Sequence, residues 1–385
     1  MQYIKIIFFY LLRRSISVIS LFLNVKNNRI LFTSFNGKQY SCNPKYILEY
    51  LIRNSTKNYE FILVLNNKIN DLPSCIKTVK YMSWKYIYYY FTSKIIITNM
   101  GFKSIFKKPK GQYRIETWHG GGAYKRTDLD ICSDMFKRFR YKLVGEELNY
   151  YIASCAAFAK LMAKAQCIPS ERFLKIGMPR NDIFFIKSKR AINNKKVRDK
   201  YCLKENWKII LYAPTWRDDG RASKIKDICE VVSYLNKVKP EKHILLCRAH
   251  HSGNLTNNFN VEEFINVTNY PDMQELLCAA DILITDYSSC MWDFSLMYKP
   301  CFIYATDIDQ YKQERDFYTP MSEWPFPIAT NTDELINNIL NFNQEEYVEK
   351  VKQHHKALGS FEDGHACERV CKLIEDIIDG KVQKQ

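Results

Sequence analysis

The chain has 385 residues, a length that suits two domains, and 46% of them are hydrophobic, which excludes a largely disordered protein. Lys and Arg number 57 against 41 Asp and Glu, so the formal net charge is +16, which predicts an anionic partner: nucleic acid, an anionic lipid surface or a polyanionic substrate. The 13 cysteines include no C-x-x-C pair. This spacing argues against a disulfide framework or a zinc site and favours reduced thiols in a cytosolic compartment.

Residues 1–28 predict an N-terminal amphipathic helix. Two apolar runs, 6–12 and 15–25, are separated by two arginines, and each is too short to cross a bilayer. On a helix, one face collects the polar residues Arg13, Ser17, Ser20 and Asn24. This pattern is typical of a helix that lies on a membrane surface, and the alternative is a helix packed on the protein's own core. No small-residue cleavage site follows, so we do not expect a secretory signal.

Beyond residue 28, short continuous apolar runs alternate with helical patterns. The first series of expected strands lies at residues 29–34, 60–65, 94–98, 112–117, 150–154 and 173–177. The second series lies at residues 208–213, 242–248, 264–268, 281–285 and 300–304. Continuous apolar strands separated by helices indicate parallel sheets that are buried on both faces. We therefore predict an α/β fold with two Rossmann-like, doubly wound domains, 29–186 and 202–385, joined at 187–201 by a basic linker or a linker with a helix.

A histidine followed by three glycines comes directly after the expected strand 112–117. His119 precedes Gly120, Gly121 and Gly122, which leave the backbone free to adopt positive φ and to approach a ligand closely. A histidine at the carboxyl end of such a strand suits a general base, because the unperturbed pKa of imidazole lies near neutrality. The alternative is a histidine whose hydrogen bonds are satisfied within a turn.

Three motifs of the second series suit the binding of a phosphate or diphosphate. Arg248 and His250 follow one strand, Asp286, Ser288 and Ser289 follow another, and Thr215 and Arg217 follow a third. Cations, and serines at the start of a helix, can stabilise the charge of a leaving phosphate. The alternatives are surface histidines, serines that only cap the helix, and residues that only close a loop. A metal pair at the adjacent histidines is disfavoured, because neighbouring side chains on an extended chain point in opposite directions.

No Walker loop, G-x-G-x-x-G or G-x-S-x-G motif occurs, and no carboxylate cluster suggests a metal site. Together the motifs resemble the CDP-glycerol:poly(glycerophosphate) glycerophosphotransferase family of teichoic acid and related capsule synthesis. The resemblance covers roughly residues 29 to 375. It rests on motifs in a fixed order: Ser34–Ser41 with Asn43-Pro44, Thr117–Gly120, Gly177–Asp182, Ala213–Arg217, Arg248-x-His250, Thr285–Ser289 with Asp293-Phe294 and Lys299-Pro300, and Asp363-Gly364 with Glu368-Arg369.

The resemblance implies a GT-B architecture, two Rossmann-like domains facing a central cleft, with the acceptor domain first and the CDP-donor domain second. It implies transfer of a polyol phosphate, glycerol phosphate in the first instance, to a hydroxyl of a teichoic-acid-like or capsular polymer. His119 would deprotonate the acceptor hydroxyl, and His250 would stabilise the phosphate as CMP departs. Thr215, Arg217, Arg248, Asp286, Ser288 and Ser289 would bind or shape the site of the donor diphosphate. No metal and no cofactor is implied.

Two positions depart from the family's pattern. Many members have Trp-His-Gly-Thr-Pro, whereas Gly121 and Gly122 follow Gly120 here, so this loop is expected to influence the choice of acceptor. The family's Arg-Gly-x-Tyr is matched by Arg315, Asp316, Phe317 and Tyr318, with an acidic residue in place of glycine. Arg315 and Tyr318 are therefore further candidates for binding the donor.

Three other functions compete with this one. A ribitol-phosphate transferase or a CMP-sugar-using glycosyltransferase would use the same fold. A nucleic-acid-binding protein would explain the charge, but the basic residues are spread along the chain without a recognised motif. A non-catalytic scaffold at the membrane would not need His119. We expect the chain to attach peripherally to the cytoplasmic face of a bacterial cell membrane and to act on a lipid-linked or polyanionic acceptor. An anionic membrane and such an acceptor explain the positive charge without nucleic acid.

Overall fold

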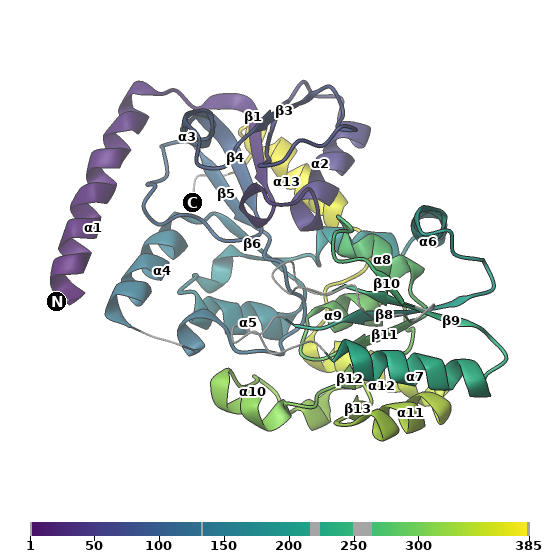
Figure 1. The fold of residues 1–385 in the computed structure, drawn as a ribbon. Helices are drawn as coiled ribbons and strands as arrows, with labels where there is room; N and C mark the ends of the chain where they lie inside the picture. Colours follow the sequence, from purple (N-terminus) through teal and green to yellow (C-terminus); the bar gives the residue numbers. More distant parts are fainter. Residues whose placement is uncertain (1, 132–133, 216–223, 249–263, 383–385) are drawn as a thin grey trace. The chain divides into compact units, whose positions relative to one another are not determined.

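The computed structural model describes residues 2–131, 134–215, 224–248 and 264–382 (Figure 1). The chain forms two compact units that exchange segments. The first unit contains residues 1–120, 127–182 and 360–385, and the second contains residues 121–126 and 183–359. Each unit is built around one parallel sheet with helices packed against it.

The sheet of the first unit has seven strands, all paired in parallel. In spatial order they are β3 (Ile76–Val79), β2 (Glu60–Val64), β1 (Lys26–Thr33), β4 (Ser93–Thr98), β5 (Tyr113–Glu116), β6 (Tyr150–Ala153) and β7 (Phe173–Lys175). The order reverses between β1 and β4. Ligands of open parallel sheets bind outside the carboxyl ends of the strands at such a switch point.

The sheet of the second unit has six parallel strands and the same winding. In spatial order they are β10 (Phe264–Asn266), β9 (His243–Cys247), β8 (Lys208–Ala213), β11 (Ile282–Thr285), β12 (Cys301–Tyr304) and β13 (Ile328–Ala329). Its switch point lies between β8 and β11. Apolar residues of these strands, such as Ile210 and Leu245, pack on Val231 and Leu235 of the helix α7 (Ile225–Val238) in one buried cluster.

Helices of the first unit are α1 (Gln2–Ser17), α2 (Cys42–Asn54), α3 (Trp84–Thr92), α4 (Met135–Glu147), α5 (Ala156–Ala165) and α13 (Ala366–Ile378), with 3₁₀ turns η1 (Val18–Phe22), η2 (Phe35–Gly37), η3 (Asp128–Asp130) and η4 (Ser170–Arg172). Helices of the second unit are α6 (Lys187–Lys200), α7, α8 (Met273–Ala279), α9 (Cys290–Ser295), α10 (Ile308–Glu314), α11 (Thr332–Leu340) and α12 (Gln344–Leu358), with the 3₁₀ turn η6 (Met321–Glu323). A further 3₁₀ turn, η5 (Pro179–Phe184), lies where the first unit passes into the second.

The α/β class, the two doubly wound sheets and the N-terminal helix are confirmed. All eleven expected strands are present, and two strands were missed. β3 has two exposed residues between two buried ones, and β13 has only two residues. Both are edge strands, whose sequences lack the continuous apolar run of a central strand.

The domain boundaries differ from the expected ones at two places. The segment 187–201, expected as a linker or a linker with a helix, is mostly the helix α6, which packs on α8 and so belongs to the second unit rather than between the units. Residues 360–385, expected in the second domain, pack in the first unit, where α13 lies against α2. The buried face of α13, with Val370 and Ile374, requires a partner that a sequence pattern does not identify.

The N-terminal helix α1 presents its apolar side outward. Tyr3, Ile4, Phe8 and, in the following turn η1, Phe22 are all at least 68% exposed. In contrast, Phe9 packs edge-on against Phe136 and Phe139 of α4, and Arg13 is buried. Within the described residues, no helix is long and apolar enough to cross a membrane.

Candidate functional site

The loop after β5 places the imidazole of His119 at the carboxyl edge of the first sheet. Its Nδ1 lies 2.7 Å from the carbonyl oxygen of Asn99, which follows the neighbouring strand β4. A carbonyl oxygen only accepts, so Nδ1 carries the proton and Nε2 is left with a lone pair. The ring also packs beside Trp118 and Phe35, with centroids 4.5 and 5.8 Å away. The structure thus fixes the tautomer that a general base needs.

A buried carboxyl group, Glu116, supports this loop from the end of β5. One of its oxygens accepts from the backbone N–H of Trp118 at 2.9 Å, and the other accepts from Gly101 at 2.9 Å. Burial raises the pKa of Glu116 to about 8, against the opposing effect of those N–H groups. Sequence reasoning gave Glu116 no role, although an acidic residue at the end of a buried apolar strand was a usable signal.

Asn43 ties the same loop to two other motifs of the first unit. Its side-chain amide donates to the carbonyl oxygens of Thr117 and Trp118, each at 3.1 Å, and its Oδ1 accepts from the backbone N–H of Arg180. Asp182 in turn accepts from the first N–H groups of α13. These motifs, which contributed to the resemblance, therefore act as supports for the His119 loop.

In the second unit, Asp286 and Thr215 meet at the switch point between β8 and β11. The Asp286 carboxylate accepts from the backbone N–H of Thr215 at 2.8 Å and from that of Tyr287. Asp286 is buried, and these two hydrogen bonds tie the end of β8 to the end of β11. Its role in shaping a donor site stays a prediction.

Ser288 and Ser289 follow directly and begin the helix α9. Ser289 makes no side-chain cap, and the Oγ of Ser288 lies 3.5 Å from the N–H of Cys290, the limit of a hydrogen bond. Simple capping, the alternative considered for these serines, is therefore weak. Both hydroxyls are partly exposed at the edge of the sheet.

Arg248 follows β9, the strand beside β8. Its Nη1 is buried and makes no hydrogen bond within the part of the chain that the structure describes. Burial lowers the pKa of the guanidinium, and the carboxylate of Asp272 opposes this shift. A partly buried cation whose Nη1 group is buried and unused favours an anionic ligand.

Arg315 and Tyr318 lie on the loop after α10, and aromatic packing connects this loop with the serine loop. Tyr287 stacks on Tyr311 with centroids 4.1 Å apart, and Phe317 packs on both rings. These three rings are buried, so the loops 286–289 and 315–318 are packed against a common core in the second unit.

Two predicted residues, Arg217 and His250, lie outside the residues that the structure describes, and their roles stay predictions. A cavity of about 670 Å³ in the second unit is lined by Trp324, Phe326, Tyr347 and His354, among others, and by none of the predicted site residues. The predicted residues therefore gather at two sheet edges, one in each unit, rather than at this cavity.

Comparison with known proteins gives three findings. The profile of the CDP-glycerol:poly(glycerophosphate) glycerophosphotransferase family matches residues 15–376. The chain is 33% identical over 369 residues to a teichoic acid poly(glycerol phosphate) polymerase of Staphylococcus epidermidis, covering 91% of this chain and 51% of that protein, so it spans about half the length of that relative. It is 29% identical over 366 residues to the polymerase of the same description from Bacillus spizizenii, covering 91% of each. A solved structure of the wall teichoic acid polymerase TagF matches with a TM-score of 0.82 at 30% identity, covering 94% of this chain and 91% of that one.

Proposed function

The chain belongs to the CDP-glycerol:poly(glycerophosphate) glycerophosphotransferase family, and we propose that it transfers glycerol phosphate from CDP-glycerol to a hydroxyl of a teichoic acid polymer, releasing CMP. Both relatives are named as poly(glycerol phosphate) polymerases, which favours CDP-glycerol as the donor over CDP-ribitol or a CMP-sugar. A capsular polymer as acceptor stays a prediction.

The observation that carries the proposal is the orientation of His119. Its Nδ1–H donates to the carbonyl of Asn99, so Nε2 can accept the proton of an acceptor hydroxyl. The hydroxyl oxygen forms a bond to the phosphorus that bears glycerol, and the bond from that phosphorus to the bridging oxygen breaks. The electron pair leaves with CMP.

The second unit supplies binding of the donor in this proposal. Arg248 offers a buried N–H group to the diphosphate, Ser288 and Ser289 offer hydroxyls, and Asp286 fixes their loop. Positioning and charge stabilisation account for most of the catalysis of phosphoryl transfer, which matches this set of residues. The first unit is then the acceptor domain and the second the donor domain.

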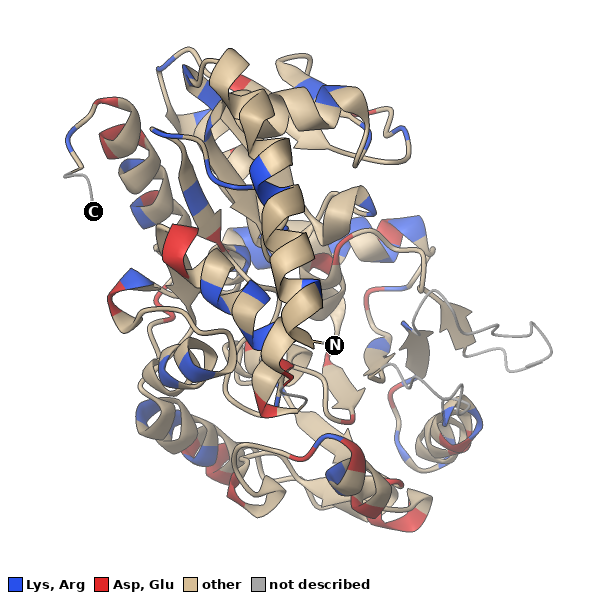
Figure 2. Cartoon of the chain, turned by 90° about the vertical axis from the view of Figure 1, so that its left-hand side faces the viewer, with Lys and Arg blue, Asp and Glu red and all other residues tan. Residues whose placement is uncertain are grey.

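The exposed apolar side of α1 supports attachment to a membrane surface. In Figure 2 the ribbon of α1, beside the N-terminal label, carries few charged residues. Exposed apolar residues of this helix include Ile4, Phe8 and Leu11. Such a helix binds a bilayer in the interface plane, with nearby cations attracted to anionic lipids. We propose that α1 and η1 hold the chain at the cytoplasmic face of the membrane, where a lipid-linked acceptor is within reach.

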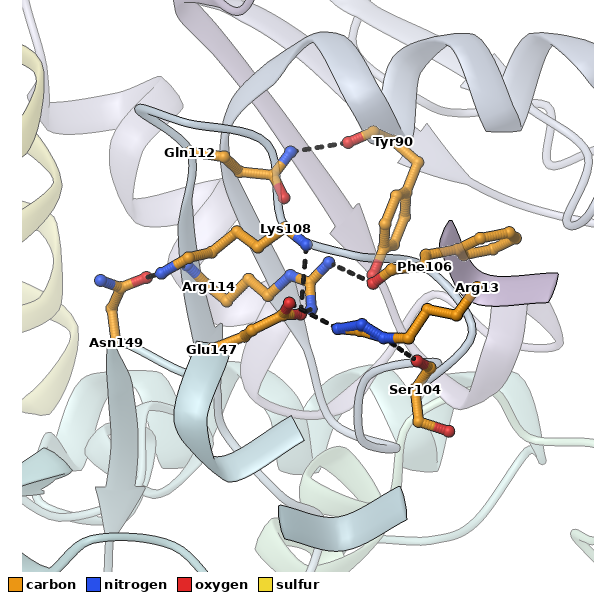
Figure 3. Close-up of polar contacts among 9 residues, drawn as sticks. All are labelled: Arg13, Tyr90, Ser104, Phe106, Lys108, Gln112, Arg114, Glu147 and Asn149. Atoms are coloured by element: carbon orange, nitrogen blue, oxygen red, sulfur yellow. Dashed lines mark hydrogen bonds and ion pairs between the residues drawn. The ribbon is translucent and has the colours of Figure 1, made fainter. Parts of the chain in front are cut away.

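A buried ion cluster fixes the orientation of α1 (Figure 3). The carboxylate of Glu147 pairs with Arg13 of α1 through one oxygen and with Arg114 of β5 through the other, at 2.9 Å for Arg114. Arg13 also donates to the carbonyl of Ser104 at 3.0 Å. Burial, together with the nearby Arg114 cation, lowers the pKa of Lys108 to about 8. Because Arg13 binds this side of α1 to the protein, the exposed apolar residues of the helix stay available for lipid.

The test of the proposed function is CMP release from CDP-glycerol, with CDP-ribitol and CMP-sialic acid in parallel and a membrane extract, then a defined teichoic acid primer, as acceptor. The expected result is release from CDP-glycerol and loss of release in His119→Ala. Release only from another donor would replace the substrate in the proposal. No release from any donor with the defined primer would overturn it and favour a non-catalytic scaffold.

A further inference from the structure

The segment that follows His119 belongs to the second unit, although His119 itself belongs to the first. The chain leaves the first unit after Gly120, residues 121–126 pack in the second unit, and Thr127 returns to the first. We call residues 121–126 the strap. His119 is two positions before the strap. Because consecutive Cα atoms are about 3.8 Å apart, the strap limits how far the His119 backbone can move.

The strap pairs with the loop that carries Arg315 and Tyr318. Lys125 forms an antiparallel bridge with Phe317. The N–H of Tyr318 donates to the carbonyl of Tyr124 at 2.8 Å, and the N–H of Arg126 donates to the carbonyl of Asp316 at 3.2 Å. The strap and the candidate donor loop are thus joined by one isolated β-bridge and two flanking backbone hydrogen bonds, a short ladder outside the named strands.

Side chains reinforce the ladder at both ends. The guanidinium of Arg126 pairs with the carboxylate of Asp316 at 3.0 Å. The hydroxyl of Tyr124 lies 3.0 Å from Nε2 of His354, and its ring packs edge-on against Trp324. The strap is therefore attached to the second unit by charge and by aromatic packing, independently of any ligand.

Both departures from the family's pattern lie at this contact. A Cβ atom at Gly121 would come within 2.2 Å of the buried ring of Trp292, and Gly122 has φ +68° with Tyr124 occupying the space of a side chain. Asp316, in the place of glycine, has φ +61° and holds Arg126. A left-handed backbone tolerates aspartate better than most residues, but at some cost relative to glycine. The carboxylate that pairs with Arg126 gives a reason for aspartate here.

We propose that Arg126 and Asp316 are positioning residues, which hold the strap on the donor loop and so fix the His119 loop for transfer. This inference rests on the proposed function, in which His119 is the base and Arg315 and Tyr318 contact the donor. The pair is about half exposed, so it contributes little to the free energy of unfolding. Its effect is expected on the rate of transfer, because small displacements of a catalytic group cost a large part of the rate.

The test compares Arg126→Asp and Asp316→Asn, which break the ion pair, with Arg126→Lys, which keeps a cation opposite Asp316. Asparagine is tolerated on the left-handed backbone at position 316, so Asp316→Asn removes the charge without added backbone strain. Lys195→Asp, which breaks an exposed pair with Asp199 on α6, is the matched control. Arg126→Asp and Asp316→Asn are each expected to lower kcat about 10-fold with the KM for CDP-glycerol within about twofold, and to speed hydrogen exchange of residues 117–126 about 5-fold. Arg126→Lys retains most of the rate and of the protection, and the control changes neither.

Unchanged kcat and exchange in Arg126→Asp and Asp316→Asn would overturn the inference, as would an equally large loss of kcat in Arg126→Lys. A raised KM at normal kcat would also overturn it, because the pair would then serve donor binding. Failure of the proposed function is recognised separately, since the wild-type chain would then release no CMP. The exchange measurement, which needs no substrate, still decides whether the pair holds the His119 loop.

Discussion

The two units have the same strand order but carry different chemical groups at the carboxyl ends of their strands. In the first unit, the ends of β4 and β5 carry a carbonyl, a buried carboxyl and the imidazole of His119, which together suit proton transfer. In the second unit, the ends of β8, β9 and β11 carry a buried cation, two hydroxyls and Asp286, which suit binding of an anion. The shared fold determines where a ligand binds, and the side chains determine what is done there.

Breaking the ion cluster should affect the first unit most strongly. Glu147→Gln leaves the buried Arg13 and Arg114 without their carboxylate, and we expect a loss of about 3 kcal/mol in the free energy of unfolding. Chemical denaturation followed by hydrogen exchange measures the loss and assigns it to a unit. Glu146→Gln, at the exposed neighbouring residue, is the control. Equal stability of the two variants would contradict a structural role for the cluster.

Replacing Arg248 tests the anion site of the second unit. Arg248→Gln removes the buried guanidinium, and we expect CDP-glycerol to bind about 30- to 100-fold more weakly, corresponding to about 2–3 kcal/mol for a charged hydrogen bond. Calorimetry measures the affinity. Lys242→Gln, just before the amino end of the same strand, should bind as the wild type does. An unchanged affinity in Arg248→Gln would remove this residue from the donor site.

Acid should destabilise the second unit through two neighbouring histidines. Burial lowers the pKa of both His354 and His355 to about 4, so both stay neutral in the folded chain. The unfolded chain binds protons near pH 6.5, so stability is present above that pH and is lost as pH falls from about 6.5 towards 4.

We expect a loss of about 1–2 kcal/mol per histidine at pH 5, measured by thermal unfolding across this range. His355→Gln should remove part of the pH dependence, whereas His365→Gln, at an exposed histidine, should not. If the wild type, His355→Gln and His365→Gln showed the same dependence of stability on pH, the prediction that burial lowers the pKa of His355 in the folded chain would be wrong.

Substitutions on α1 and η1 should weaken membrane binding, with an effect per residue that is the smallest of those predicted here. Ile4→Ser, Phe8→Ser and Leu21→Ser each remove an exposed apolar group, and we expect about 1 kcal/mol per side chain in partitioning to vesicles with anionic lipid. Point variants are preferable to deletion of residues 1–25, because deletion also removes Arg13 and uncovers Phe136. Tyr234→Ser on α7 is the control, and equal partitioning of all variants would exclude α1 as the binding surface.

Much of this organisation was predictable from the sequence. Buried parallel strands have continuous apolar sequences, so the central strands were predicted directly, and with them the positions of His119 and Asp286 after the carboxyl ends of β5 and β11. The packing of α13 in the first unit was not predictable, because the sequence of an amphipathic helix does not specify the surface that covers it. Asn99 contacts His119 through its backbone carbonyl, which any residue would supply, and Arg126 and Asp316 are 190 positions apart in the sequence, so neither contact has a local sequence signal.

The most direct test of the division between the units is His119→Ala assayed for both donor binding and transfer. The account predicts that CDP-glycerol binds with an affinity within about twofold of the wild type, while the rate of CMP release in the presence of acceptor falls about 10²- to 10⁴-fold, the usual contribution of a general base. A variant that loses donor affinity, or that transfers at the wild-type rate, would contradict the assignment of proton transfer to the first unit and donor binding to the second.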